Sequence, residues 1–238
     1  MHRLSKPISN PRSNMLSTFP EKANLLEQYG VDHLVKIPFT QEFAQMTPED
    51  YIKVILSERV KTSNMIIGYD HRFGKDRAGG LDELKAFAPK YNYEVEEIPR
   101  QDIDEIGISS TKIRRALETG DIETANKYLG RSYAVTGKVT HGKKLGRSIG
   151  FPTANVVVKE SYKLIPADGI YAVKVCNKYR KFDGMLNIGQ RPTVGGENKT
   201  IEVHIFDFNQ DIYDKEISLE FIDHIRNEIK FDSLEALK

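Results

Sequence analysis

The residues best suited to chemistry lie in the stretch 137–155, which is rich in glycine and in basic side chains and closes with Pro152-Thr-Ala-Asn155. Glycine allows backbone N–H groups to approach a ligand closely and point at it, while Lys and Arg neutralise negative charge. This composition predicts a loop that holds a phosphate group.

The same stretch matches the phosphate-binding pattern GxxxxGK[ST] only in part, from Gly137 to Lys143. Lys144 stands where that pattern requires a hydroxyl side chain for magnesium. The residues before Gly137 favour a strand, and no helical pattern follows Lys143. We therefore reject this motif and expect a glycine-rich, cationic loop between two strands.

Thr153 and Asn155 supply the oxygen ligands that the rejected motif lacks. Alternate residues of an extended segment point to the same side, so a hydroxyl and a carboxamide oxygen would project together beside the loop. Magnesium in phosphoryl-transfer sites takes one or two such protein oxygens, with water and phosphates as its other ligands. The alternative is that both residues merely open a strand after a proline.

Glu202 and His204 lie on one face of an alternating strand at 200–208. Glu202 is either a solvated outer residue or an inward-facing residue with a task. If it faces the glycine-rich loop, it could be the general base that accepts the proton of an alcohol attacking a γ-phosphate. For His204 we favour packing or hydrogen bonding over metal ligation, because no second His or Cys stands at ligand spacing.

Composition limits the classes of function. The 238 residues carry 35 Lys and Arg against 34 Asp and Glu, a net charge of +1, which argues against a general binder of nucleic acid or anionic membranes. The single cysteine, Cys176, excludes an intrachain disulfide and fits a packed strand better than a nucleophile. No apolar run approaches the roughly 20 residues of a membrane span, and no signal core is present, so we expect a cytoplasmic protein.

The pattern of elements changes along the chain. Residues 1–18 show no periodicity and are expected to be loose. Helices and strands then alternate: a helix from residue 20, a strand at 31–39, a helix opened by Thr47, a strand at 65–68, a helix at 81–88 and a strand at 93–98. This order predicts an α/β domain with a parallel sheet over 19–115.

A helix is expected to begin near Ser109, and its hydroxyl-rich start is either an ordinary N-cap or a phosphate site. Two short helices that end at Gly120 and Gly130 make 116–130 a helical linker. Beyond residue 131, six short alternating runs at 133–140, 155–158, 170–175, 181–188, 200–208 and 217–221 predict a small antiparallel β-barrel over 131–238.

Several stretches of this second half resemble riboflavin kinases. Gly146-Arg-Ser-Ile-Gly-Phe-Pro-Thr-Ala-Asn155 matches the family signature G-x-x-x-G-F-P-T-A-N. Residues 187–193, 202–204, 211–213, 225–226 and 231–235 match the family in order and spacing. The resemblance covers essentially all of residues 131–238 and implies an ATP-dependent kinase that converts riboflavin to FMN.

The resemblance also implies a role for individual residues. Thr153 and Asn155 would hold Mg²⁺ and the phosphates of ATP, and Glu202 would be the general base on the ribityl 5′-hydroxyl. The ATP side would further include Gly142, Arg147 and Tyr213. The flavin would lie by Arg226 and Phe231. The expected partners are riboflavin and ATP, with neither nucleic acid nor membrane.

The first half resembles the adenylyltransferase module of the bacterial bifunctional riboflavin kinase/FMN adenylyltransferases, also called FAD synthetases, through residues 67–74 and 108–114. The resemblance implies nucleotidyltransferase residues at Asp70, Ser110, Thr111 and Arg114. The family's G-x-F-D-G-x-H-x-G-H segment is not found in these 238 residues, and the family's last helix continues past Lys238. We therefore expect an incomplete Rossmann-like nucleotidyltransferase domain followed by a six-stranded barrel of riboflavin kinase type.

Three other functions stay open. FMN adenylylation, which gives FAD, would require that a longer natural chain supply the missing loop. A non-catalytic flavin- or nucleotide-binding module is a second possibility, although Thr153, Asn155 and Glu202 favour an enzyme because a binding protein needs no base. A nucleic-acid-binding barrel is the weakest, because the basic cluster at 138–147 has no interleaved aromatic residues for base stacking.

Overall fold

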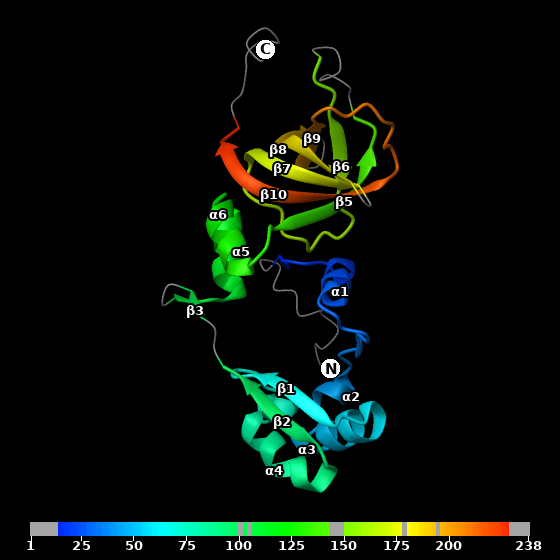
Figure 1. Cartoon of the computed structure of the whole chain (residues 1–238), viewed down its shortest axis with the longest axis vertical. Coiled ribbons are helices and arrows are strands. Elements are labelled where there is room, and N and C mark those ends of the chain that lie inside the picture. Colours follow the sequence, from blue (N-terminus) through cyan, green and yellow to red (C-terminus); the bar gives the residue numbers. More distant parts are fainter. Residues whose placement is uncertain are drawn as a thin grey trace. The chain divides into compact units, whose positions relative to one another are not determined.

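The computed structural model describes residues 14–99, 102–103, 106–142, 150–177, 180–193 and 196–228. Arg147 and Phe231, both predicted site residues, lie outside these ranges. The chain divides into two compact units, one formed by residues 32–107 and one by the described parts of 9–31 and 108–238 (Figure 1).

The first unit is built on two parallel strands, β1 (Asn64–Gly68) and β2 (Glu94–Ile98). Five helices belong to it: α2 (Gln41–Ala44), α3 (Pro48–Asp50), η1 (Tyr51–Val60), η2 (Lys75–Arg77) and α4 (Leu81–Tyr91). A short antiparallel pair, β3 (Asp102–Ile103) and β4 (Ile106–Gly107), follows. Ile52, Ile67 and Leu84 are buried in its core, so the parallel α/β pattern is confirmed for this part.

Local sequence rules account for the helix that begins after Thr47. The Thr47 hydroxyl accepts a hydrogen bond from the backbone N–H of Asp50 at 3.1 Å and donates one to its carboxylate at 2.7 Å. Thr47 is thus the predicted N-cap, and Pro48 occupies the first turn, where its missing N–H costs nothing.

The strand expected at residues 31–39 is wrong. These residues form neither helix nor strand, and Val35 and Phe39 are 64% and 66% exposed. An alternating run becomes a strand only when a neighbour satisfies its backbone N–H and C=O groups, and β1 pairs only with β2 in the described sheet.

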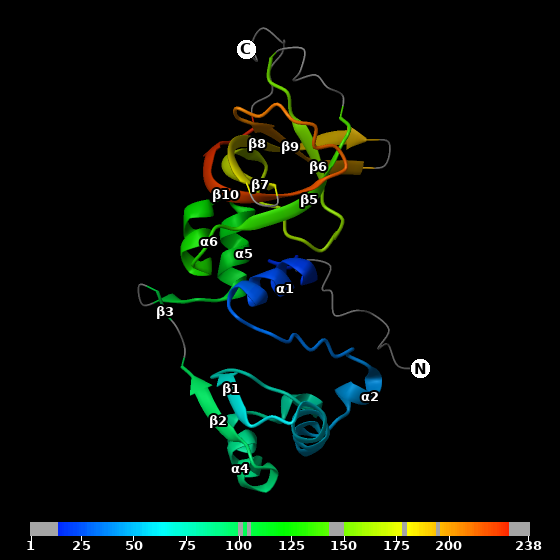
Figure 2. The ribbon, with the colours of Figure 1, turned by 45° about the vertical axis from the view of Figure 1, so that its right-hand side comes forward.

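The second unit contains a closed barrel of six antiparallel strands, which confirms the architecture predicted for this half (Figure 2). Its strands are β5 (Ala134–Thr140), β6 (Ala154–Val157), β7 (Gly169–Asn177), β8 (Arg180–Thr193), β9 (Gly196–Ile205) and β10 (Glu216–Arg226). Around the barrel they follow the order β10-β5-β6-β9-β8-β7. Each strand of the closed barrel thus has a neighbouring strand on both sides.

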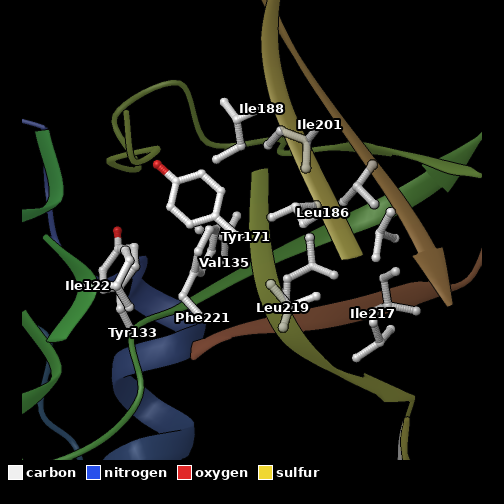
Figure 3. Close-up of a cluster of buried hydrophobic side chains, with 14 of the residues drawn as sticks. Ile122, Tyr133, Val135, Tyr171, Leu186, Ile188, Ile201, Ile217, Leu219 and Phe221 are labelled. Atoms are coloured by element: carbon white, nitrogen blue, oxygen red, sulfur yellow. The ribbon is translucent and has the colours of Figure 1, made fainter. Parts of the chain in front are cut away.

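Apolar side chains fill the barrel because every strand alternates between its two faces. Along β9, Ile201, Val203 and Ile205 are buried, whereas Glu202 and His204 are not. Figure 3 shows the labelled aromatic and aliphatic side chains of several strands meeting inside, among them Tyr171, Leu186, Leu219 and Phe221.

Cys176 is a half-buried strand residue in which burial raises the pKa of the thiol to about 11. A thiol is nucleophilic only as the thiolate, so this environment supports a packing role for Cys176.

Three helices pack with the barrel in this unit. α5 (Ser110–Glu118) and α6 (Ile122–Leu129) place Ile113, Leu117 and Ile122 in the same buried cluster as the strands. They end at Gly120 and Gly130, both with positive φ, as the sequence predicts. α1 (Phe19–Gln28) also belongs to this unit. The domain boundaries expected from the sequence remain predictions.

A buried ion pair fixes α1 against the strands. The Lys163 Nζ atom lies 2.8 Å from Glu21 Oε2 and 2.7 Å from the Leu16 carbonyl oxygen. Glu21 also accepts a hydrogen bond from the backbone N–H of Thr136. Lys163 Nζ lies 4.5 Å from the ring centroid of Tyr133. Burial lowers the pKa of Lys163 in spite of the neighbouring carboxylate.

Replacing Lys163 by Met is expected to reduce the free energy of unfolding by about 3 kcal/mol, because it leaves the buried Glu21 carboxylate without its cation. The matched control is Lys181→Met, which removes a lysine that is 62% exposed and paired with Glu220, at a cost below about 1 kcal/mol. Urea unfolding followed by circular dichroism measures both. Equal losses in the two variants would contradict the expectation that Glu21 is left as an uncompensated charge.

Candidate active site

Three polar residues lie side by side on the outer face of the barrel. Glu202 of β9 is the cross-strand partner of Asn155 of β6 on one side and of Asn187 of β8 on the other. Directly opposed residues in antiparallel strands project to the same face, with Cβ atoms about 5 Å apart. Because the neighbours Ile201 and Val203 are buried, this row points outward.

Thr153 joins the row from the turn before β6. Its hydroxyl donates a hydrogen bond to Glu202 Oε2 at 3.3 Å. Of the residues that the sequence assigns to the metal and to general base catalysis, Thr153, Asn155 and Glu202 are therefore brought together in one place.

Gly142 brings the start of the glycine-rich loop against the same residues. A Cβ atom at this position would lie 2.0 Å from Asn155 Nδ2, so the backbone of Gly142 packs directly on the carboxamide. Thr140, the last residue of β5, is the cross-strand partner of Asn155. The loop thus leaves β5 beside Asn155, and its following residues, including Arg147, lie in the range 143–149 outside the described chain.

Tyr213 lies beside His141, where the glycine-rich loop begins. Its ring centroid is 3.9 Å from that of His141, the residue before Gly142, with 32° between the ring planes. The next residue, Asp214, forms an ion pair of 2.8 Å with Lys138, which holds the pKa of this exposed carboxyl below its usual range. These contacts join the segment before β10 to β5 and to the loop.

Arg226 closes β10 at the far end of the same row. It is the register partner of Ile170 in β7, and Ile170 is the partner of Asn187 in β8. The row across the barrel is therefore Arg226, Ile170, Asn187, Glu202, Asn155 and Thr140. Phe231, predicted beside Arg226, lies outside the described residues.

Asn187 was not identified as a site residue from the sequence. Its Oδ1 atom is buried and has no hydrogen-bond partner among the described residues. Its place in the run 180–193 puts it on the same strand face as Met185, but only the pairing of β8 with β9 puts it beside Glu202. No pattern within one strand could have revealed that neighbour.

The residues predicted for nucleotidyl transfer are divided between the two units. Asp70 follows β1 in the first unit, whereas Ser110, Thr111 and Arg114 lie on α5 in the second. The Ser109 hydroxyl accepts a hydrogen bond from the backbone N–H of Lys112 at 3.3 Å, as an N-cap does. Arg114 donates to Ser110 Oγ at 3.2 Å and to the carbonyl oxygen of Asn14 at 2.9 Å. This geometry supports the N-cap interpretation of the helix start.

Among the helices that the structure describes, none has both the length and the apolar character that crossing a bilayer requires.

Two family models match the chain: riboflavin kinase over residues 129–238 and FAD synthetase over residues 2–112. The bifunctional riboflavin kinase/FMN adenylyltransferase of Haemophilus influenzae is 40% identical over 219 residues, which cover 92% of this chain and 70% of that protein. The protein of the same name from Escherichia coli K12 is 36% identical over 224 residues, covering 94% of this chain and 71% of the relative.

A crystal structure described as a macrolide-efflux protein from Streptococcus pneumoniae is similar over 93% of this chain and 71% of that one, with 34% identity and a TM-score of 0.84. The family assignment rests on the two family models and the curated relatives. The riboflavin kinase match lies within the second unit, whereas the FAD synthetase match spans the described first unit and also includes α1 of the second. The chain belongs to the bifunctional riboflavin kinase/FMN adenylyltransferase family.

Proposed function

We propose that the barrel unit transfers the γ-phosphoryl group of ATP to the ribityl 5′-hydroxyl of riboflavin, with FMN and ADP as products. The observation that carries the proposal is the strand register that sets Glu202 between Asn155 and Asn187, with the Thr153 hydroxyl 3.3 Å from the carboxylate. A base, two oxygen ligands and a glycine-lined loop start are the parts that phosphoryl transfer to an alcohol requires.

Thr153 and Asn155 would hold Mg²⁺. Their hydroxyl and carboxamide oxygens are the hard donors that this ion takes from proteins, and they lie on one face beside a carboxylate. An ion held by these two side chains would supply positive charge to offset the negative charge of the phosphates.

ATP would lie along the glycine-rich loop. Because Gly142 has no side chain, the loop backbone can approach Asn155 closely. Tyr213, which packs on His141, would contact the nucleotide from the other side of the loop start. Arg147 would supply positive charge to the phosphates.

Riboflavin would lie on the other side of Glu202, toward Arg226 and Phe231. Arg226 is three strands from Glu202 in the row, roughly 14 Å along the sheet at a strand spacing of about 4.8 Å. A flavin whose ring end meets Arg226 would extend its ribityl chain past Asn187 toward Glu202.

In the reaction, a Glu202 carboxylate oxygen accepts the proton of the 5′-hydroxyl as that oxygen bonds to the γ-phosphorus. The bond between the γ-phosphorus and the bridging oxygen breaks, and ADP leaves with the electron pair. The hydrogen bond from Thr153 orients the carboxylate, and proximity supplies much of the rate because alcohol and phosphate are held in line.

The test of this function is chromatographic separation of flavins after the protein is incubated with riboflavin, ATP and Mg²⁺. FMN is the expected product. If the folded protein yields neither FMN nor FAD, the barrel is instead a flavin- or nucleotide-binding module.

A second activity, adenylylation of FMN to FAD, is favoured by the FAD synthetase model over residues 2–112. Asp70, Ser110, Thr111 and Arg114 would take part in it. Supplying FMN with ATP in the same assay distinguishes the two activities, because FAD then forms without a kinase step. We further propose a cytoplasmic enzyme whose partners are riboflavin and ATP, with neither nucleic acid nor membrane.

Glu202→Gln is expected to lower kcat for FMN formation about 10²–10⁴-fold, the usual contribution of a general base, and to leave ATP binding nearly unchanged. The matched control is Glu220→Gln, at a barrel carboxylate that pairs with Lys181. Steady-state kinetics and calorimetric ATP binding give both quantities. Equal turnover of Glu202→Gln and the wild type would remove Glu202 as the base.

Gly142→Ala is expected to weaken MgATP binding about 10-fold, because the new methyl group displaces the Asn155 carboxamide. The unfolding midpoint should hardly change, since the displaced atoms end a side chain. In an Asn155→Ala background the same substitution should have little further effect, as expected for residues that act through one contact. Calorimetry on the four proteins measures this coupling, and additive losses would contradict the assigned contact.

A further inference from the structure

The segment that carries Thr153, just before β6, has little backbone pairing with β9 to hold it in place. β6 and β9 share only two register pairs, Ala154 with Val203 and Asn155 with Glu202. Pro152, two residues before β6, has no N–H and cannot extend the ladder as a donor. Side-chain contacts therefore hold this segment against β9, and the hydrogen bond from Thr153 to Glu202 is one of them.

His204 makes another such contact with its side chain. Its Nδ1 atom lies 2.8 Å from the carbonyl oxygen of Pro152. A carbonyl oxygen accepts hydrogen bonds only, so Nδ1 carries a proton in this contact. The imidazole also packs edge-to-face with Phe151 and Phe206, at centroid distances of 5.6 and 5.5 Å.

His204 and Glu202 stand two residues apart on the same face of β9, so one rigid strand presents both side chains. The hydrogen bond from His204 holds the Pro152 carbonyl, and the next residue, Thr153, places its hydroxyl 3.3 Å from Glu202. The strand that bears the carboxylate thus also anchors the segment that bears the hydroxyl.

We propose that His204 is a positioning residue that fixes the segment 152–153, just before β6, on β9, so that Thr153 and Asn155 keep their places relative to Glu202. The inference rests on the proposed function, because the expected losses of MgATP binding and of kcat presuppose that Thr153, Asn155 and Glu202 form the kinase site. The hydrogen bond that Nδ1 donates to Pro152 positions the segment, whereas the imidazole ring only packs against Phe151 and Phe206.

Two variants separate the donor from the ring. His204→Asn keeps an N–H donor near the position of Nδ1 but removes the ring, whereas His204→Phe keeps a ring and removes the donor. His204→Phe is expected to weaken MgATP binding and to lower kcat about 10-fold each, as the loss of an outer hydrogen bond to ligand-bearing groups does. His204→Asn should stay within about 3-fold of the wild type, because the donor is kept.

The measurements are calorimetric binding of MgATP and of riboflavin, steady-state kinetics, and the unfolding midpoint. Loss confined to MgATP binding and kcat in His204→Phe, with riboflavin binding retained, supports the inference. Equal behaviour of the two variants, or equal loss of both ligands, overturns it and makes His204 a packing residue only.

A third variant tests the route of the effect. In a Thr153→Val background, His204→Phe should change kcat much less than in the wild type, because residues that act through one contact are not additive. Full additivity overturns the inference. The MgATP readout also separates this inference from the proposed function: if Glu202→Gln turns over normally while His204→Phe still loses MgATP, the base assignment fails and the positioning role stands.

Discussion

The register of three adjacent strands is the constraint on which the candidate site depends. Asn155, Glu202 and Asn187 are far apart in sequence and meet because β6 pairs with β9 and β9 with β8 at one set of positions. A slip of one residue would turn Glu202 into the barrel and bring Val203 to the surface. The apolar interior forbids that slip, because it would bury a carboxylate and expose the core of β9. The packing of the barrel therefore fixes the geometry of its outer face.

Much of this architecture could be predicted from the sequence, since its rules are local. Period-two runs gave the six strands, and Thr47, Ser109, Gly120 and Gly130 marked helix ends by side-chain and backbone chemistry. The sequence did not decide whether the Glu202 side chain lies inside or outside the barrel, because alternation divides a strand into two faces without saying which one is inside. Asn187 was missed for a related reason, since cross-strand neighbours are set by pairing. The run at 31–39 failed as a strand because its alternation has no partner in the described sheet.

The barrel separates stability from chemistry. Its interior is filled with apolar side chains, and polar groups gather outside, where strands supply rigid positions and loops supply close approach. Gly142 and Pro152 illustrate two ways in which loop segments are placed beside the polar row that contains Asn155 and Glu202. Glycine removes the side chain that would collide with Asn155. Pro152 lies beyond the last register pair of β6 with β9, and its carbonyl oxygen contacts the His204 side chain instead. Both devices set the positions of polar atoms.

The contact between Glu21 and Lys163 joins residues 142 positions apart, and residues 32–107 of the first unit lie between them in the chain. The second unit is thus discontinuous, and its N-terminal helix emerges from synthesis long before the strands it packs on. Loop-closure entropy grows only with the logarithm of the length that must close, so the separation costs little at equilibrium. The separation affects the order of folding steps instead, because α1 cannot pack until β5 and the residues around Lys163 have been synthesised. If the first unit is already folded by then, the flexible chain to be closed is shorter, and an inserted domain becomes an aid to the assembly of its host.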